Sequence, residues 1–287
     1  MDAVIIDTLA DRLIRAEMSR TPVELPSVEY PTMTVDDGYQ VQRAIVAKKV
    51  ARGARVVGKK LAFTSRHNQE LFGVHEPAYG FLLDSGVQTP DTPVESAALI
   101  QPLIECELVF VMRRRLTGPG ATVPDVLRAT EGIMPALEIA DSRLRDWIGR
   151  ARASDIVADS CGNAGIVTGG ELHALQHVDL RDTAVVAEKN GAVIATAVTG
   201  VVMGNPAAAV AWLVNKLAES ELSLEEGELV LSGAVIGALP VAAGDVLEAT
   251  FGGGLGSVGL RLTARGSRRC GATSRREAGR RRADEKG

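Results

Sequence analysis

The chain has 287 residues, of which 46% are hydrophobic, and a formal net charge of −4, so it can bury a sizeable core and is neither disordered nor fibrous. Its apolar stretches end before the roughly 18 residues of a membrane helix, and its first residues lack the basic opening of a signal peptide. We therefore expect a cytoplasmic protein that does not contact a membrane. The three widely spaced cysteines exclude a disulfide framework and a zinc cluster.

Two helices separated by a loop are predicted at the N-terminus. Apolar residues recur near the helical period over residues 4–19 and again over residues 39–52. Thr34 is a suitable N-cap for the second helix, and Gly53 is a suitable stop. The intervening residues 21–32 are rich in proline, which is typical of a loop. Residues 1–53 are thus expected to form an N-terminal helical cap.

After Gly53 the sequence changes to short strand-like runs separated by glycine and proline. Helices are predicted at residues 124–130 and 206–220, and Asn190-Gly191 is typical of a tight hairpin turn. Many strands with few helices indicate an α+β fold, in which residues 54–264 form a β-rich catalytic domain. The predicted strands cover residues 55–63, 103–112, 136–141, 165–168, 184–189, 192–198, 229–231, 245–250 and 256–262.

The end of the chain has a different composition. Residues 265–287 carry nine basic and three acidic side chains, whereas the preceding part is acidic overall. With few large apolar side chains this segment cannot bury a core, which predicts a disordered basic tail. We favour a solvated extension over contact with an anionic surface, and no nucleic acid is expected as a partner.

Three acidic residues lie inside predicted strands. Glu105 and Glu107 share one face of their strand because side chains alternate, and Glu138 lies on a second strand. Carboxylates this close repel each other in an apolar setting unless a cation lies between them or one is protonated. The pattern alone leaves two interpretations open, a Mg²⁺ or Mn²⁺ site made of oxygen ligands and a solvated face of an edge strand.

An ordered set of motifs extends through most of the chain. They occupy residues 53–65, 72–84, 101–107, 136–143, 204–213, 231–233, 238–245 and 255–258. Together these motifs resemble the 2-keto-4-pentenoate hydratase and 4-oxalocrotonate decarboxylase family of the fumarylacetoacetate hydrolase superfamily, in order from about residue 5 to residue 263, and the specificity lies in the ordered set. The resemblance implies a mixed β-sheet roll of the fumarylacetoacetate hydrolase C-terminal-domain type with an N-terminal helical cap, and a homo-oligomer.

The resemblance also assigns roles to residues. It implies a divalent cation, Mg²⁺ or Mn²⁺, held by Glu105, Glu107 and Glu138, and a catalytic lysine at Lys60. Alternation makes Lys60 the inward side chain and Lys59 the solvated one. Arg143 is a candidate carboxylate clamp, with a structural salt bridge to Asp141 or Asp146 as the alternative. The substrate-binding candidates are Thr64, Ser65, Tyr79, Arg143, Asp159, Ser160 and Ser232.

The family's two reactions differ at a few positions. Hydratases of the family carry an aspartate where this chain has Ala78, whereas decarboxylases tend to have an apolar residue there. At a second position, this chain has Ser160 where the family typically has an asparagine. The overall pattern nevertheless favours a hydratase that adds water at C4 of 2-hydroxy-2,4-dienoates in meta-cleavage-type catabolism of aromatic compounds.

Three other functions were considered. A decarboxylase is the near alternative. A non-catalytic partner of a related hydratase or decarboxylase subunit is disfavoured by the intact glutamates and Lys60, and acylpyruvate hydrolysis ranks lower because the histidine and glutamate it needs are not found. Cys161 is not expected to act as a nucleophile, because no base is paired with it in the sequence.

Overall fold

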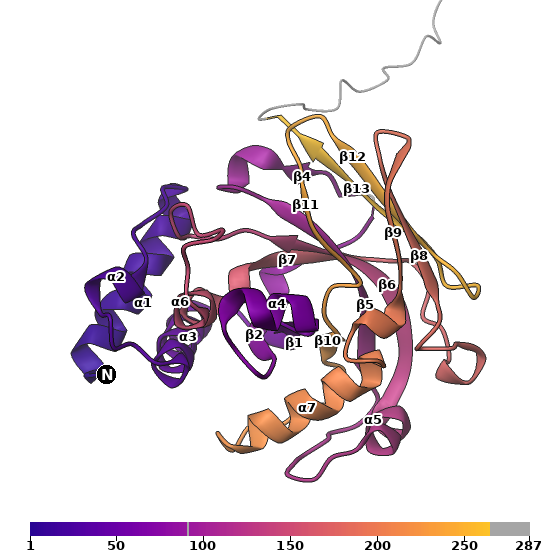
Figure 1. The fold of residues 1–287 in the computed structure, drawn as a ribbon, viewed down its shortest axis with the longest axis horizontal. Coiled ribbons are helices and arrows are strands. Elements are labelled where there is room, and N and C mark those ends of the chain that lie inside the picture. The colour runs from indigo at the N-terminus through magenta and orange to yellow at the C-terminus, as the bar shows by residue number, and fades with distance from the viewer. Residues whose placement is uncertain (91, 265–287) are drawn as a thin grey trace, which may run out of the picture.

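The fold is built on two β-sheets, and the computed structural model describes residues 1–90 and 92–264. The larger sheet contains β1 (Val56–Ala62), β2 (Ala78–Leu83), β3 (Val87–Gln88), β5 (Leu103–Met112), β6 (Thr130–Ala140), β7 (Asn163–Thr168), β10 (Leu229–Leu231) and β11 (Ile236–Pro240). Their order is β2-β1-β10-β5-β6-β7-β3, with β11 paired to β5 (Figure 1). Parallel and antiparallel pairs are mixed, since β1 is parallel to β10 while β5 is antiparallel to β6.

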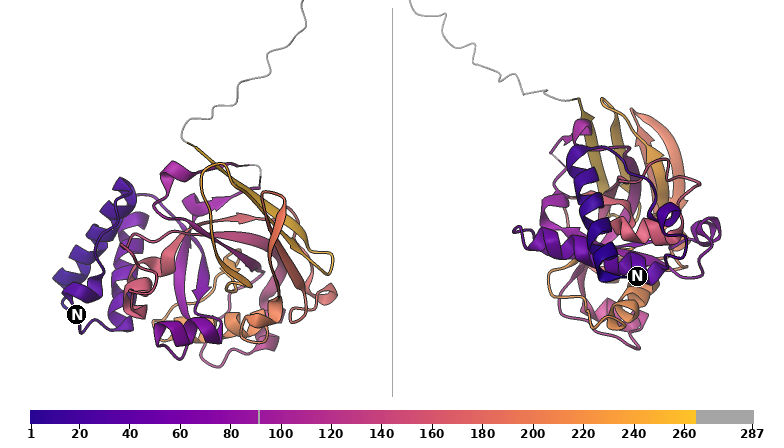
Figure 2. Two further views of the ribbon diagram at one scale, coloured as in Figure 1. Left: turned by 45° about the horizontal axis from the view of Figure 1, so that its top comes forward. Right: turned by 90° about the vertical axis from the view of Figure 1, so that its left-hand side faces the viewer.

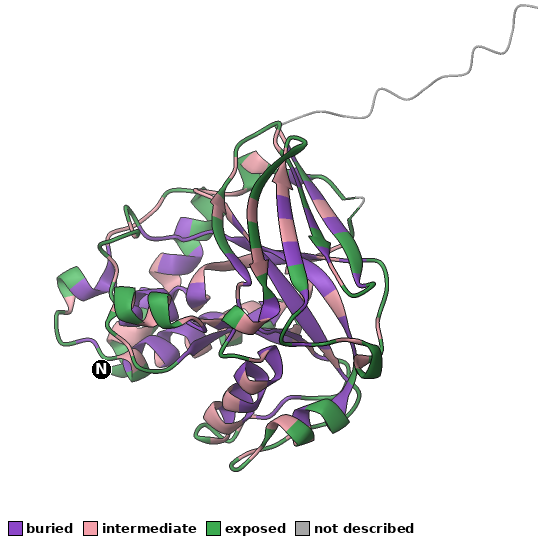
Figure 3. Ribbon diagram, turned by 45° about the vertical axis from the view of Figure 1, so that its right-hand side comes forward, coloured by how far each residue is buried: buried purple, intermediate pink, exposed green. Residues whose placement is uncertain are grey.

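The smaller sheet contains β4 (Val94–Glu95), β8 (Ala184–Lys189), β9 (Ala192–Val198), β12 (Val246–Phe251) and β13 (Gly256–Thr263), in the order β4-β13-β12-β8-β9. β8 and β9 confirm the predicted hairpin, and Asn190 and Gly191 have the positive φ angles, 54° and 80°, of a tight turn. Buried and exposed residues alternate along β12, as the colours of the strands show in Figure 3. One face of this sheet therefore packs against the core.

The helices of the described residues are α1 (Ala3–Ser19), α2 (Pro26–Glu29), α3 (Val35–Val50), α4 (Arg66–Phe72), α5 (Val123–Ala129), α6 (Ala153–Ala158) and α7 (Pro206–Ala218). α1, α3, α5 and α7 confirm the predicted helices. Thr34 caps α3 as predicted, because Asp37 N donates to Thr34 Oγ1 at 3.1 Å. Among these helices, none is long and apolar enough to cross a membrane.

Several elements were not predicted from the sequence. α4 contains no buried residue and so has no apolar period to recognise. β2 carries Gly80 in its middle, which weakens the signal of a strand. α6 and β11 were also missed, and β6 begins at Thr130, well before the predicted residue 136.

The N-terminal helices lie on one side of the sheets (Figures 1 and 2) and are joined to the rest of the fold by buried contacts. Gln42 on α3 is fully buried, and its Nε2 donates to Tyr79 O at 3.0 Å and to Val157 O at 2.8 Å. The apolar cluster between α1 and α3 also includes Leu144 and Ala158, which come from much later in the chain. The boundary at residue 53 stays a prediction, and the predicted tail at residues 265–287 lies outside the described residues.

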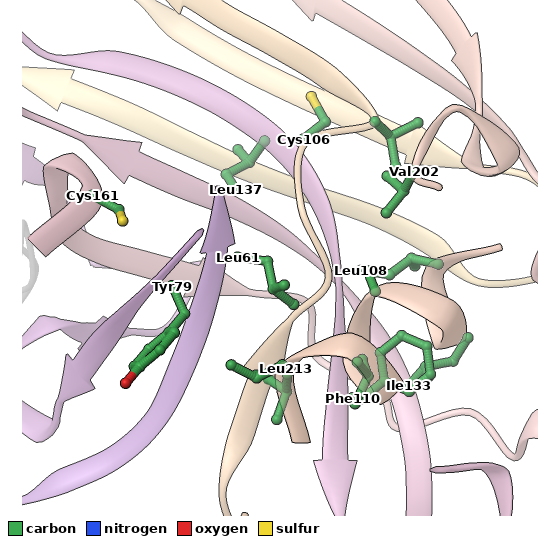
Figure 4. Packing of buried hydrophobic residues seen from close by; sticks show 14 of the residues in the cluster. Leu61, Tyr79, Cys106, Leu108, Phe110, Ile133, Leu137, Cys161, Val202 and Leu213 are labelled. Carbon is green, nitrogen blue, oxygen red and sulfur yellow. The ribbon is translucent and has the colours of Figure 1, made fainter. Parts of the chain in front are cut away.

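The larger sheet has two different faces. One face belongs to the main core, where side chains from the two sheets and α7 gather. Figure 4 shows part of this core, with Leu61, Phe110 and Leu213 among the labelled residues. The other face carries a small, fully buried cluster of Leu82, Val109, Ala136, Ile166 and Leu231, contributed by β2, β5, β6, β7 and β10. These strands reach one another because the sheet curls until β2 approaches β7, where Asn163 Nδ2 donates to Phe81 O at 2.7 Å. The second face is therefore the inner surface of a curled sheet.

Asp155 on α6 is a buried connection between distant segments. Its carboxylate is fully buried and accepts hydrogen bonds from Ser27 N at 2.7 Å, Ser27 Oγ at 2.6 Å and Arg152 N at 2.9 Å. Asp155→Ala would leave these donors unpaired, so we expect it to lower the free energy of unfolding by about 3 kcal/mol. Urea denaturation followed by circular dichroism measures this change.

Asp125 on α5 provides a matched control. It accepts a hydrogen bond from Thr122 N at 3.0 Å in the same helical position, but its side chain is 40% exposed. Asp125→Ala should cost about 1 kcal/mol, the usual value for an exposed cap. Equal losses for the two variants would contradict the importance of burial at Asp155.

Candidate active site

Three glutamate side chains meet on the inner surface of the curled sheet. Glu105 on β5 lies directly opposite Glu138 on β6, and Glu107 follows on the same face of β5. One carboxylate oxygen from each residue lies within 4.8 Å of the other two. The antiparallel pairing of β5 with β6 therefore brings together the three carboxylates that the sequence pattern singled out.

Two of these carboxylates are fully buried and have few partners. Glu107 Oε2 accepts a hydrogen bond from Gly233 N at 2.8 Å, and Glu138 Oε1 lies in an ion pair with Lys60, but Glu107 Oε1 and Glu138 Oε2 have no partner among the described residues. Burial raises the pKa of Glu107 well above its usual range, and the charges of Glu138 and Glu105 raise it further. Burial also raises the pKa of Glu138, to about 7. Buried oxygen atoms with these properties match the ligands that Mg²⁺ and similar hard cations require.

Lys60 on β1 supplies one positive charge to this group. Its Nζ lies 3.0 Å from Glu138 Oε1 as an ion pair and donates a hydrogen bond to Cys161 O at 3.0 Å. Burial by itself would lower the pKa of Lys60, but the carboxylates of Glu138 and Glu105 outweigh it and raise the pKa above the ordinary value. The side chain is therefore an ammonium. When all three carboxylates are ionised, one ammonium leaves two negative charges, which a divalent cation would balance.

Lys59 was expected to be solvated, and this prediction is wrong. Its side chain is buried on the opposite face of β1, where Nζ lies 2.6 Å from Glu228 Oε2 and donates to Ser223 O at 3.2 Å. The sheet is covered on both faces at this position, so the neighbour of an inward lysine also needs a buried partner. The alternation of side chains correctly placed Lys59 and Lys60 on opposite faces of β1. It did not show that the face of Lys59 is also buried.

Gly80 allows the turn at Ser160–Gly162 to approach Lys60. Gly80 pairs with Lys60 across β2 and β1, and a Cβ atom at Gly80 would lie only 2.5 Å from Ser160 O. Ser160 and Cys161 both adopt positive φ angles, 54° and 53°, in this turn. Close packing of the turn is thus what presents Cys161 O to the ammonium of Lys60.

Arg143 and Asp159 form a buried ion pair. Arg143 Nε lies 2.6 Å from Asp159 Oδ1, and the guanidinium also donates to the carbonyl oxygens of Asp141 and Asn163 at 2.8 Å and 2.9 Å. Asp159 Oδ2 in turn accepts from Ser142 Oγ at 2.8 Å. These contacts bind both side chains to the protein itself, so the structural salt bridge is formed with Asp159 in place of Asp141 or Asp146.

The remaining substrate-binding candidates are not all in one place. Thr64 lines the cavity described below, and Ser232 is fully buried with an Oγ that has no hydrogen-bond partner among the described residues. Ser65 caps α4 by accepting a hydrogen bond from Asn68 N at 3.2 Å. Tyr79 is stacked on Tyr39, with ring centroids 4.7 Å apart. Ser160 lines a separate hollow of about 70 Å³ next to Arg143.

A cavity of about 190 Å³ opens beside the glutamates. Lys60, Glu105 and Cys161 line one part of it, and apolar side chains from α4, the segment 147–149 and α6 line much of the rest. These walls could not be predicted from the sequence, because an apolar side chain that lines a cavity has the same pattern as one in the core. The wall residues that were missed are Phe63, Leu71, Phe72, Leu103, Trp147, Ile148 and Ile156.

Cys161 is poorly suited to act as a nucleophile. Burial raises the pKa of its thiol to about 12, although the charge of Lys60 partly opposes this shift. The thiol therefore stays protonated near neutral pH, and the thiolate is the reactive form.

Comparisons with known proteins give a consistent result, although no family model matches the chain. The chain is 36% identical to 2-hydroxyhexa-2,4-dienoate hydratase of Comamonas testosteroni, over 91% of this chain and 99% of that protein. It is 37% identical to 4-oxalocrotonate decarboxylase of Pseudomonas sp. strain CF600, over 85% and 92%. The structure of 4-oxalocrotonate decarboxylase from Pseudomonas putida G7, complexed with magnesium and adipate, superimposes with a TM-score of 0.88 at 35% identity, over 91% and 98%.

Glu107→Gln tests the three carboxylates as a cation site. The variant removes one charge and keeps an oxygen for Gly233 N, so we expect about 10- to 100-fold weaker Mg²⁺ binding by calorimetry. In the absence of metal, the same substitution should stabilise the protein. Folding raises the pKa of Glu107, so at any pH above the pKa of this carboxyl group in the unfolded chain the group lowers the stability of the metal-free protein. Neutral glutamine lacks this cost and should raise the melting temperature at pH 7.

Glu131→Gln is the control, because Glu131 lies on the same strand as Glu138 with a side chain that is 51% exposed. It should leave both the Mg²⁺ affinity and the melting temperature unchanged. Unchanged Mg²⁺ affinity in Glu107→Gln would rule out this residue as a ligand.

Proposed function

The chain belongs to the 2-keto-4-pentenoate hydratase and 4-oxalocrotonate decarboxylase family of the fumarylacetoacetate hydrolase superfamily, and from this we propose that it is a hydratase of 2-hydroxy-2,4-dienoates or their 2-oxo-4-enoate tautomers. The reaction adds water at C4 and requires a divalent cation. Relatives with this activity cover most of the chain, and one is a 2-keto-4-pentenoate hydratase at 33% identity. We propose that this hydration serves meta-cleavage-type catabolism of aromatic compounds.

The observation that carries this proposal is the charged end of the cavity. Glu105, Glu107 and Glu138 offer buried oxygen ligands, and Lys60 is fixed beside them. A Mg²⁺ or Mn²⁺ ion held there would act as a Lewis acid toward the carboxylate and C2 oxygen of a 2-oxo acid. The arrangement thus suits reactions in which negative charge develops on the C2 oxygen.

Lys60 is proposed as the catalytic residue. Its ammonium is held by Glu138 Oε1 and Cys161 O, each 3.0 Å away, and Lys60 lines the cavity. The raised pKa keeps the side chain protonated, so it can donate a hydrogen bond or a proton to a substrate oxygen. The cavity provides few other groups for this role. The Cys161 thiol is neutral, and the carboxylate oxygens of Asp141 already accept hydrogen bonds from Ile100 N and Gln101 N.

Decarboxylation of 4-oxalocrotonate is the second candidate function. Ala78 is buried at the start of β2, where it pairs with Ala62, so this position offers no acid or base for handling water. The similarity to the two decarboxylases reported above supports this candidate as well. The same carboxylates and lysine would serve both reactions, which is why the reaction must be decided by measuring products.

We also propose that the chain forms a homo-oligomer, with a related hydratase or decarboxylase as a further candidate partner. Large apolar side chains are exposed along the edge strand β9, where Val193 is 59% and Ile194 is 44% exposed. An exposed apolar edge of this kind is suited to burial against another subunit.

Product analysis tests the reaction. The Mg²⁺-loaded protein is incubated separately with 2-hydroxyhexa-2,4-dienoate and with 4-oxalocrotonate, and 4-hydroxy-2-oxo products and CO₂ are quantified. We expect hydration that stops on addition of a chelator and resumes with Mg²⁺. CO₂ release without any hydration would replace the first candidate by the second, and turnover that persists without a cation would contradict both.

Lys60→Met tests the catalytic lysine. Removing its ammonium should lower kcat by about 100- to 10,000-fold, the usual range for a lost general acid or base, while Mg²⁺ binding persists. Lys59→Met is the matched control, because Lys59 is equally buried but lies on the other face of β1. It should lower thermal stability and leave kcat of the folded protein nearly unchanged; equal losses of kcat would show that Lys60 has no special role.

A further inference from the structure

The cavity points to a particular substrate class. We propose that this chain selects dienoates with a single carboxylate and an apolar tail, and that it discriminates against dienoates with a second carboxylate at the tail. This inference rests on the proposed function, which fixes the first carboxylate at the cation site. The relatives act on substrates of both kinds by name, so family membership alone does not decide between them.

The cavity is strongly asymmetric in charge. Lys60 and Glu105 lie at the end that would hold the cation and the first carboxylate. From there a bound dienoate would extend along mainly apolar walls, contributed by Phe63 just after β1, by α4, by the segment 147–149 and by α6, with Thr64, Asn68 and Ser142 as uncharged polar groups. The apolar wall residues are Phe63, Leu71, Phe72, Trp147, Ile148 and Ile156. An apolar tail gains free energy by leaving water for such a surface.

A second carboxylate would find no positive partner in this cavity. Lys60 is the one basic side chain among the described residues that line it, and Lys60 is already paired with Glu138. The two carboxyl groups of the lining, Glu105 and Asp141, would repel an anionic tail. A tail carboxylate would therefore lose its hydration without gaining an ion pair.

Three arginines of the surrounding segments are paired with carboxylates outside the cavity. Arg143 is paired with Asp159 at 2.6 Å, and Arg66 on α4 is paired with Glu70 at 3.0 Å. Arg150, next to the segment 147–149, is paired with Glu24 at 3.0 Å. None of these three arginines lines the cavity. Reaching a tail carboxylate would require each to leave its present partner.

The mouth of the cavity is also apolar. Leu71 and Ile148 line the cavity although they are 60% and 65% exposed, which places them where it meets solvent. An apolar tail that reaches this mouth would cover both side chains. The two residues therefore act as specificity-determining positions that a charged substitution can test without disturbing the core.

The experiment compares two substrates that undergo the same hydration and differ in tail charge. The full-length Mg²⁺-loaded protein is assayed with 2-hydroxyhexa-2,4-dienoate and with 2-oxo-hept-4-ene-1,7-dioate. We expect kcat/KM to be about 100-fold higher for the monocarboxylate, as when a binding site leaves a polar group unpaired. Equal values, or a preference for the dicarboxylate, would overturn the inference and leave the proposed hydratase function intact.

Substitutions at the mouth identify the cause of the preference. Ile148→Lys should raise the dicarboxylate to monocarboxylate ratio of kcat/KM by about tenfold, because it supplies the missing positive charge. Ile148→Gln controls for the loss of the apolar surface, and Val4→Lys on α1 controls for a charge added at an exposed position that does not line the cavity; neither should raise the ratio. The inference fails if the ratio rises equally in Val4→Lys or stays unchanged in Ile148→Lys.

The two proposals fail in different ways. If the folded, Mg²⁺-binding protein hydrates neither substrate, then the proposed function is wrong and this inference falls with it. If it hydrates both substrates equally well, then only the proposed preference for an apolar tail is wrong.

Discussion

The structure depends on an imbalance of charge that is held inside a curled β-sheet. Three carboxylates share the inner surface of the sheet with one ammonium, and two of the three are fully sealed from solvent. Buried charge of this kind is costly unless it is compensated, which is why the pKa values of Glu107 and Glu138 are raised. A divalent cation removes this cost, so the feature that destabilises the empty site also gives it affinity for metal.

The rest of the fold holds this group in position and closes it off. Pairing of β5 with β6 sets Glu105 opposite Glu138, Gly233 N holds Glu107, and the close approach of Gly80 to the turn at Ser160–Gly162 places an acceptor at Lys60. The sheet thus provides the charged groups, whose positions are fixed by strand register. α4, α6 and the segment 147–149 provide apolar walls, so that the charged end and the apolar walls of the cavity come from different parts of the chain.

Local patterns in the sequence were sufficient for the elements with a regular period. The alternation of Glu105 and Glu107, the N-cap at Thr34 and the turn at Asn190-Gly191 each act over a few residues, and the structure has all three. Elements without such a period were missed, as in α4, which buries no residue, and β2, which Gly80 interrupts. Lys59 was placed on the correct side of β1 but in the wrong environment, because Glu228 lies far along the chain.

The sequence by itself determined which residues could take part in the chemistry: the carboxylates, the lysine and the family to which their motifs belong. Only the tertiary structure decided how they are used. It paired Arg143 with Asp159, placed Tyr79 in an aromatic stack, and built the apolar walls beside Lys60 from segments that are distant in sequence. The physical reason is that backbone periods and caps are local, whereas the partner of a buried charge and the lining of a cavity depend on how distant segments pack.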